Sequence, residues 1–422
     1  MTTLNDLCEL IVDCEHRTAP PAPDGYPLIR TPDIGHGHLM VDTALRVDEE
    51  TYRTWTRRAA PQPGDLILAR EAPVGNVGIV PPGIRPVLGQ RTVLIRPKAD
   101  ALDPQYLNYL LSSPRVRGWM DGVASGATVP HLNLSDIRAF ELRELPPIRV
   151  QRRIGAALAA YDDLIENNNR RIKILEEMAQ RIYRDWFVDF RYPGHEGVPL
   201  VDSELGPIPK GWDACTLERF TEITIGGDWG NDEPEDDGWE QVACLRGVDL
   251  PRIRMGNTST ARSRWIKRSS LATRQVTESD VIVEASGECG RTLAVDPALE
   301  SLLGLPTVYS NFCKRLRCAS SAHALFVSRL FDAMIASGEM TNFQTGVAIP
   351  NLNLKGLVAS RKVVKPPDAL LMRFEELTRP MLKFALTGTS ENLRTTRDLL
   401  LPRLISGELD VSDLDIAMPE PA

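Results

Sequence analysis

The sequence predicts an α+β protein: two mixed α/β domains at opposite ends of an antiparallel two-helix coiled coil, with a pseudo-two-fold internal repeat. Three observations lead to this prediction. The chain has 422 residues, which is too long for one ordinary hydrophobic core. A heptad pattern runs through residues 149–190, and a second helical pattern lies near the C-terminus. The segments before these two helices share short strings in the same order.

The first domain, predicted for residues 1–148, mixes short strands with a helix. Apolar runs at Leu66–Ala69 and Thr92–Ile95 have the length and composition of strands, and glycine and proline turns separate them. Pro104–Leu111 follows a helical pattern. We therefore expect a mixed α/β domain that ends at the paired prolines before the long helix.

Residues 149–190 form the predicted first coiled-coil helix. Apolar side chains fall on its a and d positions, namely Ile165, Ile172, Leu175, Ala179, Ile182 and Trp186. Asn168 also falls on d, where a buried amide would fix the register; the alternative, a solvated first turn at Asn167–Asn169, stays open. A seam this narrow needs a partner helix, and the C-terminal helix is the comparable candidate.

A linker rich in proline and glycine, residues 191–212, leads to a second domain at residues 213–367. This domain repeats the first. Asp65–Val80 aligns without gaps on Asp280–Val295, and Gly126–Leu134 aligns on Gly346–Leu354. Two polar pairs also recur, Arg30 with Arg246 and Gln90 with Asn311. Matches in constant order at a nearly constant offset indicate two copies of one unit.

The second coiled-coil helix is predicted for residues 368–407. It runs over Ala369–Leu386, breaks at Gly388 and resumes over Ser390–Ile405. Leu386, Leu393 and Leu400 are spaced by seven residues, which matches the seam of the first helix. We expect the remaining residues, 408–422, to be a flexible tail.

Composition restricts the class of protein. The 42% hydrophobic and 25% charged residues are typical of a globular protein, and no apolar run reaches the length of a membrane span. With no signal peptide at its start, we expect a cytoplasmic protein without membrane contact. The net charge of −8 disfavours non-specific nucleic-acid binding but permits a basic face. Seven scattered cysteines without a Cys-x-x-Cys pair predict free thiols and no metal site.

The sequence contains no catalytic signature. We find no phosphate-binding Gly-x-x-x-x-Gly-Lys loop, no Gly-x-Gly-x-x-Gly, no Gly-x-Ser-x-Gly and no His-Glu-x-x-His. We therefore assign no catalytic residues and no cofactor to the chain. Two alternatives stay open: a DNA-modifying enzyme with an unrecognised active site, and a coiled-coil scaffold that binds only protein.

The duplicated layout resembles the specificity (S) subunits of type I restriction–modification systems. Pro146-Pro147-Ile148-x-x-Gln151-x-x-Ile154 is similar to the entry of that family's spacer helix. Trp186–Phe190 followed by Gly206–Trp212 is similar to its exit. Asp13–Thr18 and Leu404–Leu409 also fit the family. The second copy departs from the pattern, because Pro366-Pro367-Asp368 has no matching glutamine.

The resemblance implies a non-catalytic subunit with two target recognition domains, each reading one half of a bipartite double-stranded DNA sequence. It also implies partners: two methyltransferase (M) subunits that carry S-adenosylmethionine, and restriction (R) subunits that use ATP and Mg. We expect the helices to hold the methyltransferase subunits through surface outside the seam, with Met178, Tyr183 and Phe187 as candidates.

Side chains that could read or hold DNA occur in the loops of both domains. Arginine, asparagine and glutamine pair with base edges, and basic groups also hold phosphates. In the first domain the candidates are His16, Arg17, Thr18, Arg30, Arg70, Glu71, Gln90 and Arg91. In the second domain they are Arg246, Arg252, Arg254, Arg262, Arg264, Lys267, Glu288 and Asn311. The pairs that recur in both copies have an equally good explanation as shared structural hydrogen bonds.

Overall fold

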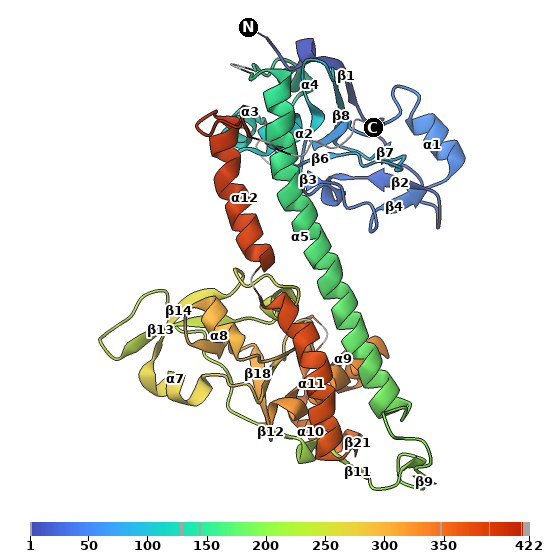
Figure 1. Cartoon of the computed structure of the whole chain (residues 1–422), viewed down its shortest axis with the longest axis vertical. Coiled ribbons are helices and arrows are strands. Elements are labelled where there is room, and N and C mark those ends of the chain that lie inside the picture. The colour runs from blue at the N-terminus through green and yellow to red at the C-terminus, as the bar shows by residue number, and fades with distance from the viewer. Residues whose placement is uncertain are drawn as a thin grey trace. The chain divides into compact units, whose positions relative to one another are not determined.

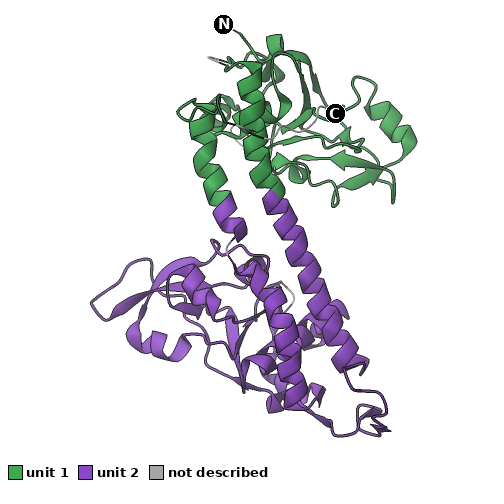
Figure 2. Cartoon of the chain, viewed as in Figure 1, with its two compact units in different colours: residues 1–163, 394–422 green, residues 164–393 purple. Residues whose placement is uncertain are grey.

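The computed structural model describes residues 2–126, 130–142, 145–346, 348–387, 389–414 and 416. It divides into two compact units (Figure 2). Unit 1 comprises residues 1–163 and 394–422, and unit 2 comprises residues 164–393. The expected break at Gly388, parts of the repeated strings at residues 127–129 and 347, and most of the tail after residue 414 lie outside the described residues.

Unit 1 contains a five-stranded sheet in the order β1-β8-β5-β6-β3 and a three-stranded sheet in the order β4-β2-β7 (Figure 1). Its strands are β1 (Cys8–Asp13), β2 (Tyr26–Ile29), β3 (His36–His38), β4 (Leu45–Val47), β5 (Leu66–Ala69), β6 (Val77–Ile79), β7 (Val87–Leu88) and β8 (Thr92–Pro97). Its helices, apart from the long ones, are η1 (Asn5–Leu7), η2 (Thr31–Asp33), α1 (Glu49–Trp55), α2 (Pro104–Ser112), α3 (Pro114–Val123) and α4 (Leu134–Arg138).

Unit 2 contains a four-stranded sheet in the order β12-β18-β15-β16 and a three-stranded sheet in the order β14-β13-β17. These strands are β12 (Thr221–Ile223), β13 (Trp239–Leu245), β14 (Arg262–Lys267), β15 (Asp280–Glu284), β16 (Thr292–Ala294), β17 (Thr307–Tyr309) and β18 (Cys313–Cys318). Three two-stranded ribbons pair β9 (Leu200–Val201) with β10 (Ile208–Pro209), β11 (Asp213–Thr216) with β21 (Lys362–Lys365), and β19 (Gln344–Thr345) with β20 (Asn351–Leu352). Its shorter helices are η4 (Leu217–Arg219), α6 (Asp249–Arg254), α7 (Arg268–Arg274), α8 (Ala298–Leu303), α9 (Ser321–Ala336), η5 (Glu339–Phe343) and α10 (Leu354–Ser360).

The strand orders confirm the internal repeat. The central antiparallel pair is β5 with β8 in the larger sheet of unit 1 and β15 with β18 in that of unit 2. The flanking strands also match, because β1 and β6 correspond to β12 and β16. In each three-stranded sheet the middle strand pairs antiparallel with one neighbour and parallel with the other. The two units therefore share one topology, to which unit 1 adds β3. Residues His36–His38 form that edge strand, which pairs parallel with β6.

Residues that recur in the repeat hold equivalent positions. The buried carboxylate of Asp65 accepts two hydrogen bonds from Arg96, at 2.8 and 2.7 Å. Asp280 accepts two from Arg317 in the same way, at 2.9 Å each. A buried charge is tolerated only when it is paired and hydrogen-bonded, so this ion pair explains why the aspartate recurs.

In unit 1 the first part of α5 (Ile148–Tyr183) packs antiparallel against α12 (Thr389–Ile405). Ile154 and Leu158 share a hydrophobic core with Leu404. Further along α5, the Asp162 carboxylate accepts hydrogen bonds from the Tyr109 hydroxyl and from Arg397, each at 2.5 Å. The pairing within this unit agrees with the helical partner that the seam requires.

The entry to α5 shows why a glutamine follows the two prolines. The Gln151 amide donates to the carbonyls of Ala101 and Pro146, at 3.2 and 2.9 Å, and accepts from the Asp103 amide at 3.0 Å. It thus ties the first turn of the helix to the globular part of unit 1. After α12, Val411 is buried in the core of unit 1, so this part of the expected tail is packed.

In unit 2 the last part of α5 and a π-helical turn, η3 (Arg184–Val188), enter the core together with α11 (Asp368–Ala385). Every predicted a position is buried, namely Ile165, Ile172, Ala179 and Trp186. Asn168 is buried as well. These findings confirm the predicted α+β class, with two mixed-sheet domains and long helices packed together. No described helix has both the length and the apolar composition that a bilayer crossing requires.

Candidate nucleic-acid interface

Three loops of unit 1 come together at one end of its larger sheet. They connect β1 to β2, β5 to β6, and β7 to β8. The Arg70 amide donates to the Arg91 carbonyl at 2.8 Å, and Arg91 forms an ion pair with Glu71 at 3.0 Å. Asp13, at the end of β1, contacts Arg70 at 2.5 Å and His16 at 2.9 Å. The structure therefore brings most of the candidates of the first domain together.

Within this cluster the side chains differ in what they offer a ligand. Arg70 is largely buried. It donates to the Leu132 carbonyl at 2.7 Å and contacts Asp13, so it positions Asp13 and the loop. Arg17, Thr18 and Gln90 are exposed. The Arg17 guanidinium lies 4.4 Å from the centre of the Trp55 ring, which fixes its direction. The exposed members are the groups that a ligand can reach.

The same cluster contains potential metal ligands, since atoms of Asp13, Cys14 and His16 lie within 4.8 Å of one another. However, the carboxylate oxygen of Asp13 that contacts His16 also receives the Arg70 guanidinium. A fixed positive charge at this oxygen opposes a divalent cation. We therefore assign no metal to the group.

The recurring arginines are structural. Arg30 donates from its backbone amide and its Nε to Asp33 Oδ2, at 3.0 Å each. Arg246 repeats both bonds to Asp249 at 2.9 Å, and in each unit Nη2 also donates to the other carboxylate oxygen, at 3.4 Å in Arg30 and 2.8 Å in Arg246. Both aspartates are buried. The recurrence thus reflects a shared ion pair, which was one of the two explanations left open by the sequence.

Unit 2 presents the equivalent loops. The Ala285 amide donates to the Phe312 carbonyl at 2.9 Å, which matches the bond between Arg70 and Arg91 in unit 1. Asn311 is exposed, and the Phe312 side chain is 62% exposed. Glu288 is exposed and pairs with Arg291 at 3.2 Å. The chain therefore places an exposed phenylalanine in unit 2 where unit 1 has Arg91.

The basic candidates of unit 2 separate into two groups. Arg252, Arg262 and Lys267 are exposed. Arg264 is buried, donates to the Trp229 and Gly230 carbonyls at 3.0 and 2.9 Å, and pairs with Asp232. It holds the loop between β12 and β13 rather than facing a ligand.

Arg254 belongs to a largely buried ion network. It contacts Glu176 of α5 at 2.8 Å and Asp332 of α9 at 2.9 Å, while Arg329 contacts the same Glu176 oxygen at 2.7 Å. Burial alone would raise the pKa of Glu176, but the two guanidinium groups outweigh it and lower that pKa to about 2. These contacts occupy the Arg254 guanidinium, so it is not available to DNA.

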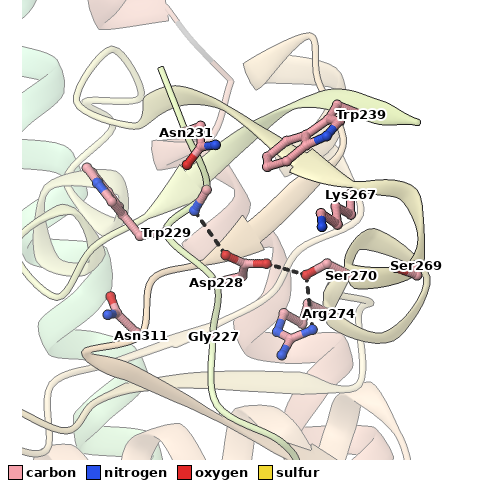
Figure 3. A pocket seen from close by; sticks show the side chains of 11 residues that line it. Gly227, Asp228, Trp229, Asn231, Trp239, Lys267, Ser269, Ser270, Arg274 and Asn311 are labelled. Atoms are coloured by element: carbon pink, nitrogen blue, oxygen red, sulfur yellow. Dashed lines mark hydrogen bonds between the residues drawn. The ribbon is translucent and has the colours of Figure 1, made fainter. Parts of the chain in front are cut away.

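A cavity of about 610 Å³ lies at the loops of unit 2 (Figure 3). Its lining comes from the loop after β12, the start of β13, the end of β14, α7 and the turn before β18. The lining residues are Gly227, Asp228, Trp229, Gly230, Asn231, Trp239, Lys267, Ser269, Ser270, Arg274 and Asn311. Among the residues predicted from the sequence, only Lys267 and Asn311 line it.

Sequence reasoning missed Asp228, Trp229 and Arg274. The loop after β12 shares no string with the first domain, but it joins the strands equivalent to β1 and β2. It is therefore the counterpart of the loop that carries His16–Thr18. Counting strands in the repeat, rather than matching strings, would have identified it.

Of the three candidates for binding a partner, two are buried and one is exposed. Tyr183 and Phe187 are 3% and 5% exposed and belong to the core of unit 2, where their rings contact Phe326 and Phe374. Their side chains offer no surface to a partner. Met178 is 44% exposed, and Ile174, one turn earlier on α5, is 55% exposed.

Comparisons with known proteins agree with this architecture. The profile of the family described as "Type I restriction modification DNA specificity domain" matches residues 2–177. The MjaIX specificity subunit of Methanocaldococcus jannaschii is 24% identical over 376 residues, which cover 87% of this chain and 82% of that protein. The HindI specificity subunit of Haemophilus influenzae is 22% identical over 376 residues, covering 76% and 81%.

A solved structure shows the same fold. The S subunit of the type I restriction–modification system from M. genitalium matches with a TM-score of 0.57 and 13% identity, over 96% of this chain and 95% of that one. The duplicated topology, the long helices and the two related sequences point to one family. Residues 2–177 match the type I restriction modification DNA specificity domain, and over most of its length the chain is similar to the specificity subunits of type I restriction–modification systems.

Proposed function

We propose that this chain reads a bipartite double-stranded DNA target, with the loop cluster of unit 1 on one half-site and that of unit 2 on the other. One observation supports this most strongly: the same three loops converge in both units, but the exposed side chains on them differ. The loops of unit 1 carry the exposed side chains of His16, Arg17 and Arg91, whereas the matching loops of unit 2 carry the half-buried Asp228 and Trp229 and the exposed Phe312. Two domains that read different DNA sequences need the same backbone framework but different side chains at the ends of their loops.

We further propose that α5 and the C-terminal helices dock two methyltransferase subunits, and that restriction subunits join the assembly. In this arrangement S-adenosylmethionine belongs to the methyltransferase subunits, and ATP and Mg belong to the restriction subunits. The exposed apolar side chains of Ile174 and Met178 support a docking surface on α5, because residues four apart on a helix share a face.

The exposed amides at equivalent turns test the reading role. In complexes of the full chain with its methyltransferase, Gln90→Ala should weaken discrimination in one half-site only, and Asn311→Ala in the other only. A good bidentate amide–base contact contributes roughly 1–3 kcal/mol of discrimination. Sequencing that maps methylated bases genome-wide measures both half-sites.

Gln62→Ala is the matched control, because Gln62 is an exposed glutamine at the other end of β5, away from the three loops. It should leave both half-sites unchanged. If Gln90→Ala and Asn311→Ala also leave the methylated sequence unchanged, these loops are not the readers.

A further inference from the structure

The cavity of unit 2 has aromatic walls. Trp229 and Trp239 lie on different sides of it in Figure 3, with Asp228 between them. The Arg264 guanidinium lies 4.7 Å from the centre of the Trp229 ring and holds this indole in place. Trp239 is buried, and the Lys267 ammonium lies 5.7 Å from its ring centre. Both indoles are therefore fixed before any ligand arrives.

The polar groups of the cavity divide into fixed and available ones. The Asp228 carboxylate accepts from the Gly230 amide at 3.0 Å and from the Ser270 hydroxyl, and Arg274 donates to that same hydroxyl at 3.0 Å. In contrast, the side chains of Lys267 and Asn311 make no hydrogen bond within the described part of the chain. Among the described residues, the cavity thus offers an ammonium and an amide without hydrogen-bond partners, beside a floor whose polar groups are already bonded.

The charges suit a ligand that is both aromatic and anionic. Two cationic side chains, Lys267 and Arg274, face one carboxylate, that of Asp228. Indole rings bind planar rings by stacking, the amide can pair with the edge of a base, and the ammonium can hold a phosphate. A nucleotide combines all three features.

The corresponding part of unit 1, around β2 and α1, has a different arrangement of aromatic side chains. There Tyr26 and Tyr52 stack on each other with ring centres 4.1 Å apart, and the Arg85 guanidinium lies 5.1 and 4.7 Å from their centres. The ring faces of Tyr26 and Tyr52 are thus covered by each other and by Arg85. These two tyrosines of unit 1 therefore do not line an open space as Trp229 and Trp239 do in unit 2.

We propose that this cavity accepts one nucleobase turned out of the duplex, in the half-site that unit 2 binds; the inference rests on the proposed reading of DNA. Inside a duplex, stacking covers both faces of every base, and only base edges reach the grooves. Indole walls recognise a ring face, so a base must leave the stack to use them.

The test replaces each base pair of the unit 2 half-site in turn with a mismatch and measures the Kd of the full complex by mobility shift. A mismatch lowers the cost of turning out a base, so one position should bind at least about tenfold more tightly than the paired target. This gain should disappear in Trp229→Leu, which removes the aromatic wall, and persist in Trp229→Phe. Trp265→Leu, on β14 outside the cavity lining, should keep the gain.

The possible outcomes separate the two claims. If no position of the half-site gains affinity, or if the gain persists in Trp229→Leu, the cavity does not receive a base. If the wild-type complex binds its target no better than a scrambled duplex, the proposed reading of DNA fails as well. Circular dichroism of each variant chain checks that the substitution leaves the fold intact.

Discussion

At the scale of residues, the internal repeat separates side chains that build the fold in both units from exposed side chains that differ between the units. Arg30 and Arg246 recur because each neutralises a buried aspartate through nearly the same hydrogen bonds. The exposed loop tips do not recur: Arg91 corresponds to Phe312. If the two domains read different sequences, as proposed, a residue that they share is better explained by folding than by specificity.

Arg246→Ala should destabilise the protein and leave its DNA specificity unchanged. The substitution leaves the fully buried Asp249 carboxylate without its ion pair, which costs roughly 3 kcal/mol, the low end for breaking a buried ion pair. Thermal unfolding of the chain measures the loss, and methylation mapping of the assembled complex measures the specificity.

Arg252→Ala is the matched control, because Arg252 is an exposed arginine of α6, the helix that also contains Asp249. Its unfolding temperature should equal that of the wild type. A change of half-site in Arg246→Ala at unchanged stability would assign this arginine to reading after all.

At the scale of elements, the sequence predicted the regular parts well. β5 and α2 begin at the predicted residues, and α11 and α12 lie within one residue of the predicted bounds. These elements have long apolar patterns or clear breaks. β3 and the two-residue β7 have neither, so periodicity cannot detect them; their partners are fixed only by the assembled sheet.

Only part of the candidate site could be predicted, because some of its residues also lie in segments without a recognisable pattern. The loop candidates of unit 1 lie together, but the cavity of unit 2 depends on a loop without any recognisable string. The heptad pattern also could not show that Tyr183 and Phe187 are buried. A helix that enters a globular core is covered over a wider arc than the single seam that a coiled-coil pattern predicts.

The ion network around Glu176 fastens α5 within unit 2. Its glutamate is the shared acceptor of Arg254, from α6, and Arg329, from α9. Because folding lowers the pKa of Glu176 from 4.5 to about 2, the ionised glutamate stabilises the folded state above about pH 4.5. This stabilisation is lost as the pH falls through the interval between these two values.

Glu176→Gln should therefore destabilise the protein at pH 7 by roughly 3 kcal/mol, the low end of the cost of breaking a buried ion pair. The difference from wild type should shrink at pH 3, because the wild-type glutamate then loses part of its own contribution. Urea unfolding at the two pH values measures both quantities. In the control Glu177→Gln, an exposed neighbour, stability should match wild type at both; an equal loss at pH 7 and pH 3 in Glu176→Gln would contradict the assignment.

The exposed face of α5 should determine the binding of the methyltransferase. The double substitution Ile174→Asp with Met178→Asp places two charges on this apolar surface, and co-purification with the methyltransferase should fall at least about tenfold, as burying unpaired carboxylates is costly. Leu200→Asp, at an exposed leucine of β9, should leave co-purification unchanged. Full recovery of the complex with the double variant would place the docking surface elsewhere.

At the scale of the whole molecule, α5 is one uninterrupted helix that carries anchor residues of both units. Asp162 bonds to Tyr109 and Arg397 within unit 1, and Glu176 joins the ion network of unit 2. The two anchors are 14 residues apart (176 − 162), which is two heptads. An insertion between the two anchors changes the length of this interval. The contacts of Asp162 and of Glu176 themselves do not depend on that length.

Inserting one heptad into α5 between Asp162 and Glu176, with a matching heptad between Leu386 and Arg397, should widen the gap between the two half-sites. Seven residues add roughly 10 Å of helix at 1.5 Å per residue. Duplex DNA rises about 3.4 Å per base pair, so the gap should grow by up to about three base pairs. A heptad keeps the a and d positions on one face, whereas inserting two residues would rotate them away from the partner helix and should prevent assembly.

Both half-sites should keep their sequences, because the insertion changes no loop. Mapping methylated bases for the wild-type and lengthened proteins gives the gap directly, and the two-residue insertion serves as the control for helical phase. An active lengthened complex with the original gap would show that the helices do not set the spacing. In that case the bound DNA or the partner subunits must set it, because the reading loops and both anchors are the same in the two proteins.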